Sequence, residues 1–395
     1  MLFKSILFLF YKIKNVMLFT KKNNLFLLYC FFLFIIFFYI ILKLYGKATL
    51  SIHEWTMSDW LVNYEDGGFK RRGVTGSVFF ALQDLFGISL PFQVFIVQVV
   101  FYALVFYLYF KLLIVKKIDW NILVLLCSPL CFMYFPINLS YSGKREIILF
   151  TLAAYFALGT MTALKERIFL VLFCIGLLIH EMFYFFLPFF IVIHIFKTQE
   201  KKYSFWLLFF ILSTIIMGII FLFGGEINEG RSLEIIRKRG VLFGSNNIFN
   251  YNFWDGIELI KKEVISYSLF IVELIIEVSM FLYYIFIFYR NRFSTFLKIV
   301  IVCVIWALPL YFLGIDWYRW NHIFSMLLLI ILITILSDKE KNDKIFSFNH
   351  NVFVKKILFA NILFFISFFI HIQYDGRGLS LKKVKDYYIS KFNRF

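Results

Sequence analysis

The stretch LFLLYCFFLFIIFFYIILKLY, residues 25–45, decides the fold class, because Lys43 is its only charged side chain. A helix that crosses a bilayer needs about 20 mainly apolar residues, and this run supplies them. Eight further runs have the same character, at 92–115, 120–137, 146–164, 203–223, 264–289, 294–313, 320–336 and 353–373. The sequence therefore predicts an all-α, polytopic integral membrane protein with about 10–12 transmembrane helices, some of them re-entrant or broken on the outer side.

The composition excludes a water-soluble enzyme. Of the 395 residues, 62% are hydrophobic and 16% are charged, whereas soluble domains are nearer half apolar and one-quarter charged. The five cysteines all lie inside apolar runs, so neither a disulfide framework nor a zinc site is expected. The net charge of +17 suits a protein among anionic lipids. No basic stripe with base-reading residues occurs, so a nucleic-acid partner is not expected.

The chain is expected to form one transmembrane domain over residues 25–373. The lysine-rich stretch 1–24 is interpreted as a cytoplasmic amphipathic segment, and 374–395 as a tail on the outer side. Residues 74–90 are too polar to sit comfortably in lipid, so we expect an interfacial or re-entrant helix. Basic residues crowd the short loops that follow alternate spans, which places the N-terminus inside. If 74–90 crossed the membrane, all later assignments would invert.

The first outer loop, 46–73, packs acids and bases beside paired glycines. Arg71 and Arg72 are predicted to bind a phosphate-type substrate, because a guanidinium matches phosphate oxygens with two parallel hydrogen bonds. Glu65 and Asp66 are candidate catalytic bases, and together with Asp59 they are an alternative site for a divalent metal. An exposed turn whose charges pair locally remains the other reading.

His180 and Glu181 divide an apolar run into two short halves, 168–179 and 182–196. Irregular backbone at membrane depth is tolerated where it lines an enclosed cavity. This predicts a broken hairpin in which His180 and Glu181 act as catalytic acid–base groups, although a buried packing histidine is the plainer reading.

Further polar groups lie at the ends of other spans. Lys144 and Arg145 precede a helix start, which favours anion binding. Asp316, Arg319 and His322 recur every three residues, so Asp316 and Arg319 are candidate substrate-binding residues and His322 a candidate catalytic base. Glu273 and Glu277 share one face of a span, as substrate contacts or as a structural ion pair.

The large outer loop, 224–263, is expected to contain an amphipathic helix near 231–239. Its basic residues Arg231, Arg237 and Arg239 are candidate substrate contacts. A substrate lid and a helix that binds lipid head groups are both consistent with this pattern.

These features resemble bacterial O-antigen and capsular polysaccharide repeat-unit polymerases. They are also similar, more broadly, to multi-span (GT-C-like) glycosyltransferases that use polyprenyl-phosphate donors and place acids in the first outer loop. The resemblance lies in the number of spans, the outer clusters of arginines and acids, and the larger outer loop in the second half. It implies an enzyme of the bacterial cytoplasmic membrane that joins polyprenyl-diphosphate-linked oligosaccharide repeat units, with membrane lipid and other polysaccharide-assembly membrane proteins as partners. No resident cofactor is implied.

Two alternatives remain open at this point. A transferase of single sugars would depend on the first-loop acids, with or without a divalent metal. A lipid-linked glycan flippase would need charges through the full depth of the membrane.

Overall fold

The protein is a helical bundle. The computed structural model describes residues 24–114, 120–138, 143–198, 202–225, 229–245, 247–250, 258, 261, 264–314, 316–335 and 362–367. Its labelled α-helices are α2 (Asn24–Ala48), α3 (Trp55–Trp60), α4 (Gly73–Phe86), α5 (Leu90–Ile114), α6 (Trp120–Leu126), α7 (Tyr134–Ile137), α8 (Glu146–Ala157), α9 (Ala163–Ile179), α10 (Leu187–Thr198), α11 (Tyr203–Phe223), α12 (Glu229–Lys238), α14 (Val264–Phe288), α15 (Phe293–Leu313) and α16 (Trp317–Ile335). Short 3₁₀ helices are η1 (Glu181–Phe186), η2 (Ile248–Asn250) and η3 (Arg290–Arg292).

Seven segments of the described chain are long and apolar enough to cross a membrane: Leu27–Ala48, Leu90–Ile114, Glu181–Thr198, Tyr203–Phe223, Phe270–Ile287, Arg290–Phe312 and Trp317–Ile335. No strand occurs within the described ranges, where only two isolated bridges are found. The prediction of an all-α, multi-pass membrane protein is therefore confirmed.

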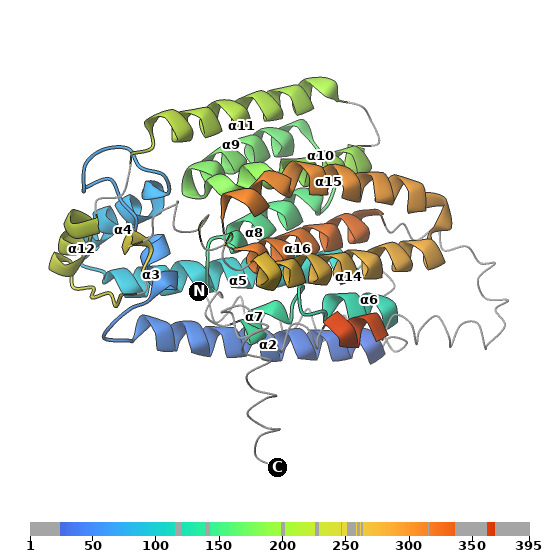
Figure 1. Cartoon of the computed structure of the whole chain (residues 1–395), viewed down its shortest axis with the longest axis horizontal. Coiled ribbons are helices and arrows are strands. Elements are labelled where there is room, and N and C mark those ends of the chain that lie inside the picture. The colour runs from blue at the N-terminus through green and yellow to red at the C-terminus, as the bar shows by residue number, and fades with distance from the viewer. Residues whose placement is uncertain are drawn as a thin grey trace, which may run out of the picture.

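The long helices differ in how much of their surface other helices cover. α16 is the central helix, with 94% of its span buried, and it packs against α8, α10 and α14 (Figure 1). α2 and α11 lie at the periphery of the bundle, and only 28% and 22% of their spans are buried. On α2 the buried side chains recur as Tyr29, Leu33, Ile36, Ile40 and Leu44, which is one stripe of a helix. The apolar side chains outside this stripe are exposed, as lipid-facing positions would be.

Three expected segments differ from the structure. The run 120–137 is two short helices, α6 and α7, joined by turns, rather than one continuous span. α8 ends at Ala157, several residues before the expected end at 164. α4 has 14 residues, so it is about 21 Å long, which is short of the roughly 30 Å of a bilayer core. The stretches 1–23 and 374–395, and most of 353–373, lie outside the described residues.

The broken hairpin at His180 is present. α9 ends at Ile179, and η1 and α10 return alongside it. The two arms meet at their far end, where Glu166 Oε1 lies 3.0 Å from His194 Nε2 and 2.9 Å from Lys202 Nζ. His180 and Glu181 therefore occupy the tip of the hairpin, at the opposite end from this ion-pair group.

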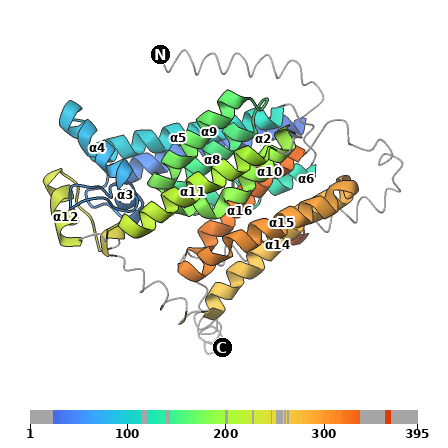
Figure 2. The ribbon, with the colours of Figure 1, turned by 90° about the horizontal axis from the view of Figure 1, so that it is seen from above.

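The first loop and the described part of the large loop pack together over one end of the bundle, and we call this assembly the loop cap. It comprises α3, residues 61–72, α4, α12 and residues 239–245 and 247–250, and Figures 1 and 2 show its helices gathered at that end. The His53 N–H donates to the Leu242 carbonyl at 2.8 Å, and the Gly225 N–H donates to the Phe69 carbonyl at 3.1 Å. These contacts fix the first loop against the second half of the chain.

Candidate functional site

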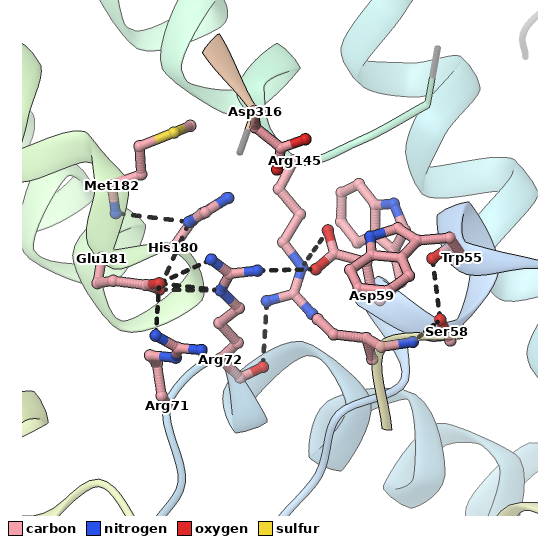
Figure 3. A network of polar contacts seen from close by, with 12 residues as sticks. Trp55, Ser58, Asp59, Arg71, Arg72, Arg145, His180, Glu181, Met182 and Asp316 are labelled. Carbon is pink, nitrogen blue, oxygen red and sulfur yellow. Dashed lines mark hydrogen bonds and ion pairs between the residues drawn. The ribbon is translucent and has the colours of Figure 1, made fainter. Parts of the chain in front are cut away.

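Where the loop cap meets the bundle lies a group of ionisable, largely buried side chains from three segments distant in the sequence. We call it the central network: Asp59, Arg72, Arg145, His180 and Glu181 (Figure 3). Asp59 comes from α3, Arg72 precedes α4, Arg145 precedes α8, and His180 and Glu181 form the tip of the hairpin.

Close packing of α4 sets the position of Arg72. Gly76 lies so near the chain after α3 that an added Cβ would be 2.2 Å from the Val62 carbonyl oxygen. Thr75 Oγ1 also donates to the Trp60 carbonyl, at 3.1 Å. Arg72 is the N-cap residue and has φ 69°, the one positive φ of a non-glycine residue in the described chain. Such a backbone costs of order 1–3 kcal/mol and persists only where the surroundings enforce it.

Arg72 binds two carboxylates at once. Its Nε lies 3.1 and 3.0 Å from the two carboxylate oxygens of Glu181, and its Nη2 lies 2.7 Å from Oε1. Its Nη1 donates to Asp59 Oδ1 at 3.3 Å. Arg71 adds a weaker contact to Glu181, at 3.6 Å, from a side chain that is 45% exposed. The guanidinium of Arg72 therefore ties α3 to the hairpin tip, as Figure 3 shows.

Arg145 enters from a turn that only glycine can make. Gly143 has φ 90°, and an added Cβ would lie 2.8 Å from Leu44 Cδ2. The Gly143 carbonyl accepts from Trp60 Nε1 at 2.6 Å and from Gln98 Nε2 at 2.7 Å. These contacts anchor the turn to α3 and α5 and so hold Arg145 in place.

The guanidinium of Arg145 is fully buried. Its Nη1 donates to the Ile179 carbonyl at 2.6 Å and to the Arg72 carbonyl at 3.2 Å. Its Nε lies 3.6 Å from Asp59 Oδ2. Its Nη2 is buried and has no hydrogen-bond partner in the described part of the protein. Burial lowers the pKa of Arg145 to about 10, so the group is still cationic at neutral pH.

Asp59 lies between the two arginines and is 1% exposed. Burial by itself raises the pKa of this carboxyl, but Arg145 and Arg72 outweigh burial and hold the pKa well below its usual range. Asp59 is therefore an anion that neutralises part of the positive charge around it.

A second group of charges adjoins the central network, and we call it the Arg319 cluster: Lys144, Glu146, Asp316 and Arg319. Arg319 Nε lies 2.6 Å from Glu146 Oε1, and its Nη2 lies 2.8 Å from Asp316 Oδ2. Lys144 lies over the ring of Trp55 at 5.8 Å, and burial lowers its pKa to about 8. Because Lys144, Arg145 and Glu146 are consecutive, the cluster and the network share one turn.

The charges of the two groups nearly balance. Arg72, Lys144, Arg145 and Arg319 supply four positive charges, and Asp59, Glu146, Glu181 and Asp316 supply four negative ones. The exposed Arg71, beside Glu181, adds a fifth positive charge at the edge of the site. Burial, with a smaller effect of Arg72, lowers the pKa of His180 to about 4, so His180 is neutral at pH 7. Arg71 therefore leaves one net positive charge at the edge of the site, which favours an anionic ligand.

The other candidate residues of the first loop lie in the loop cap and not in the central network. Glu65 pairs with Arg239 at 2.7 Å, and Arg239 also binds Asp84 at 2.7 Å. Asp66 pairs with Lys70 at 3.4 Å and accepts a hydrogen bond from Ser232. Glu65, Asp66 and Arg239 therefore fasten α12 and α4 together. Within the described residues no group of three or more His, Cys, Asp or Glu side chains gathers as a metal ion would require, and the alternative ligands Asp59, Glu65 and Asp66 each have a partner of their own.

The remaining candidates lie in other surroundings. Arg231 and Arg237 are exposed on α12, which confirms the expected amphipathic helix in the large loop. Glu277 accepts hydrogen bonds from Ser128 and, at 3.4 Å, from Ser367, and Glu273 is buried one turn away.

His322 is packed inside the bundle. Its ring stacks on Tyr134 at 3.8 Å, and its Nδ1 lies 2.8 Å from the Leu130 carbonyl oxygen. Because these contacts hold the ring in place, His322 suits a structural role in the core better than a role in proton transfer.

Two site residues received too little weight from the sequence. Asp59 stands at the centre of the network but was considered only as a base or metal ligand of the first loop. Glu146 is the partner of Arg319 and follows directly after Lys144 and Arg145. The sequence Gly143-Lys144-Arg145-Glu146 already indicates an ion pair for Glu146, because it sets an acid beside two bases at a helix start.

The fold and the site define a class: an all-helical, multi-pass membrane protein with a buried ionic site beneath one end of its bundle. Comparison with protein-family models, with curated proteins and with solved structures finds no match for the chain. The function is therefore argued from the geometry.

Proposed function

We propose that the protein is a membrane-embedded glycosyltransferase that polymerises polyprenyl-diphosphate-linked oligosaccharide repeat units for a bacterial surface polysaccharide. The observation that carries this proposal is the gathering of four cations, in the central network and the Arg319 cluster, with Arg71 at their edge. A diphosphate leaving group needs such cations, because hydrogen bonds from guanidinium groups to phosphate oxygens are short and strong.

The proposed orientation of the protein in the membrane is argued from the charges at one end of the bundle. Lys165, Arg167, Lys197 and Lys202 belong to the far end of the α9–α10 hairpin and the start of α11. The positive-inside rule supports a cytoplasmic location for that end. In this proposal the loop cap and the central network then lie on the outer face of the cytoplasmic membrane, with the N-terminus inside. A donor linked to a polyprenyl diphosphate needs no nucleotide on that side.

The proposed reaction is one substitution at the anomeric carbon. The bond from that carbon to the diphosphate oxygen breaks, and the oxygen keeps the electron pair. An acceptor hydroxyl forms the new glycosidic bond and passes its proton to a base. Arg72, Arg145 and Arg319 stabilise the departing diphosphate, and the base is Glu181 or His180 at the hairpin tip. Glu181 is the more accessible carboxylate, since its side chain is 11% exposed and that of Asp59 is 1% exposed.

The experiment is a surface-glycan gel from the source strain after deletion of the gene and its restoration as wild type or Arg145→Gln. Collapse of a long ladder to a single repeat, rescued by the wild type alone, supports polymerisation. An unchanged ladder in the deletion strain refutes it. Arg290→Gln is a matched control, because Arg290 is an exposed arginine that precedes α15.

A transferase of single sugars is the second candidate, and the burial of the first-loop acid Asp59 within the network favours it. In that case the deletion removes the first repeat itself or leaves a lighter one. If the transferase uses a divalent metal, a chelator also abolishes activity in membranes.

A further inference from the structure

A backbone contact indicates which nitrogen of the His180 ring carries the proton. The Met182 N–H donates to His180 Nδ1 at 3.4 Å, as Figure 3 shows. A ring nitrogen that accepts a hydrogen bond carries no proton, so in the neutral imidazole the proton is on Nε2. Glu181 Oε2 is 3.5 Å from the same Nδ1, but it is held by Arg72 Nε at 3.0 Å. His180 therefore presents an N–H donor at Nε2.

This donor has no acceptor. His180 is 1% exposed, and its Nε2 has no hydrogen-bond partner among the described residues. Arg145 Nη2 is in the same condition. Buried polar groups without partners cost about 1–3 kcal/mol each and are rare in native proteins. Arg145 Nε and Asp59 Oδ2 also lack a hydrogen bond, but they lie 3.6 Å apart as an ion pair. The two remaining donors, His180 Nε2 and Arg145 Nη2, therefore indicate a ligand that accepts from both.

The two donors belong to the same small region. Arg145 Nη1 donates to the carbonyl of Ile179, the residue directly before His180. In Figure 3 the imidazole of His180 extends away from Glu181, toward Asp316 and the stem of the Arg145 side chain. The Ile179 carbonyl thus ties the guanidinium of Arg145 to the backbone directly beside His180.

We propose that His180 Nε2–H and Arg145 Nη2 together bind the non-bridging oxygens of a diphosphate, and that His180 is a hydrogen-bond donor rather than the catalytic base. This inference rests on the proposed function for the source of the diphosphate, a lipid-linked sugar. It leaves Glu181 as the base, because Glu65 and Asp66 are committed to the loop cap and His322 is packed against Tyr134.

Titration of inorganic pyrophosphate into the full-length protein in detergent tests the proposal. His180→Gln places an amide N–H near the position of Nε2, so binding stays within about threefold of wild type, whereas His180→Leu and Arg145→Gln each weaken binding about tenfold or more. His194→Gln and Arg290→Gln are the controls. His194 sits at the far end of the hairpin with Glu166 and Trp206 on its two ring nitrogens, so its loss leaves binding unchanged.

Equal binding by wild type and His180→Leu overturns the proposal, as does equal loss in His180→Gln and His180→Leu. Turnover separates donor from base, because a donor role lets His180→Gln restore the glycan ladder and a base role does not. A polyprenyl diphosphate that binds more tightly than pyrophosphate identifies a lipid-linked source, and equal affinity identifies a free pyrophosphate site.

Failure of the inference and failure of the proposed function are distinguishable. Pyrophosphate binding that depends on His180 and Arg145, in a protein whose deletion leaves the ladder unchanged, supports the site and refutes the polymerase. A ladder that collapses on deletion, with binding indifferent to both residues, does the reverse.

Discussion

Asp59→Asn tests whether the central network is held together by charge. The substitution keeps the shape of the side chain and removes the anion between Arg72, at 3.3 Å, and Arg145, at 3.6 Å. Two guanidinium groups then lose a buried counter-charge. Breaking a buried ion pair by removing one partner costs about 3–5 kcal/mol. At roughly 2 °C per kcal/mol for a chain of this size, the melting temperature in detergent falls by about 6–10 °C.

A double-mutant cycle separates charge from packing. Arg145→Gln alone also lowers the melting temperature, because two backbone carbonyls lose their donor. In the double variant Asp59→Asn/Arg145→Gln the pair is absent on both sides, so the combined loss is smaller than the sum of the single losses by about 1–3 kcal/mol. Scanning fluorimetry of all four proteins at pH 7 measures this difference. Strict additivity, or a single Asp59→Asn variant as stable as wild type, contradicts the ionic account of the network.

Three further results are expected. First, His180 has a pKa of about 4 when folded and 6.5 when unfolded, so its contribution of about 3 kcal/mol to folding stability is complete above pH 6.5 and is lost on acidification towards pH 4. Between pH 7 and pH 5 the melting temperature therefore falls more for wild type than for His180→Gln. Equal falls in the two proteins contradict this. Second, Lys144 loses its charge as the pH rises through about 8, so pyrophosphate binding weakens between pH 7 and pH 9 in wild type but not in Lys144→Gln. Parallel pH profiles of the two proteins would refute a role of Lys144 in anion binding. Third, Gly76→Ala destabilises the fold by about 1–3 kcal/mol, because its Cβ would be 2.2 Å from the Val62 carbonyl oxygen, while Gly218→Ala, in open space on α11, is neutral or slightly stabilising. Thermal melting of both variants measures this difference. A Gly76→Ala variant as stable as wild type would mean that α4 does not approach the Val62 backbone so closely.

Much of the architecture could be predicted from the sequence because lipid imposes a simple rule. Backbone groups in the membrane must be satisfied internally, so long apolar runs become helices, as α2, α5, α11, α14, α15 and α16 did. The hairpin break at His180 was also predicted, since two adjacent polar residues interrupt an apolar run. The division of 120–137 into α6 and α7 was missed, because hydropathy does not record where a chain turns inside a protein.

The candidate site was predicted in part. The sequence indicated Arg72 by the density of charge around it, Arg145 by its place before a helix start, and His180 and Glu181 by their interruption of an apolar run. The structure brings these four residues together. Glu65, Asp66 and Arg239 have an equally dense charge pattern, yet they form the clasp of the loop cap. The pattern of a charge run is the same whether its partner lies in the next helix or in a ligand, so only the fold could separate the two groups.

The sequence by itself determined the helical membrane fold, the polar interruptions and the supply of arginines, because these depend on the local exchange of water for lipid along the chain. Only the tertiary structure decided which charges neutralise one another. It set Asp59 between Arg72 and Arg145, and it left donors of Arg145 and His180 without an acceptor. Ion pairs and hydrogen bonds act over a few ångströms in space, and segments separated by more than a hundred residues meet there only after the bundle has packed.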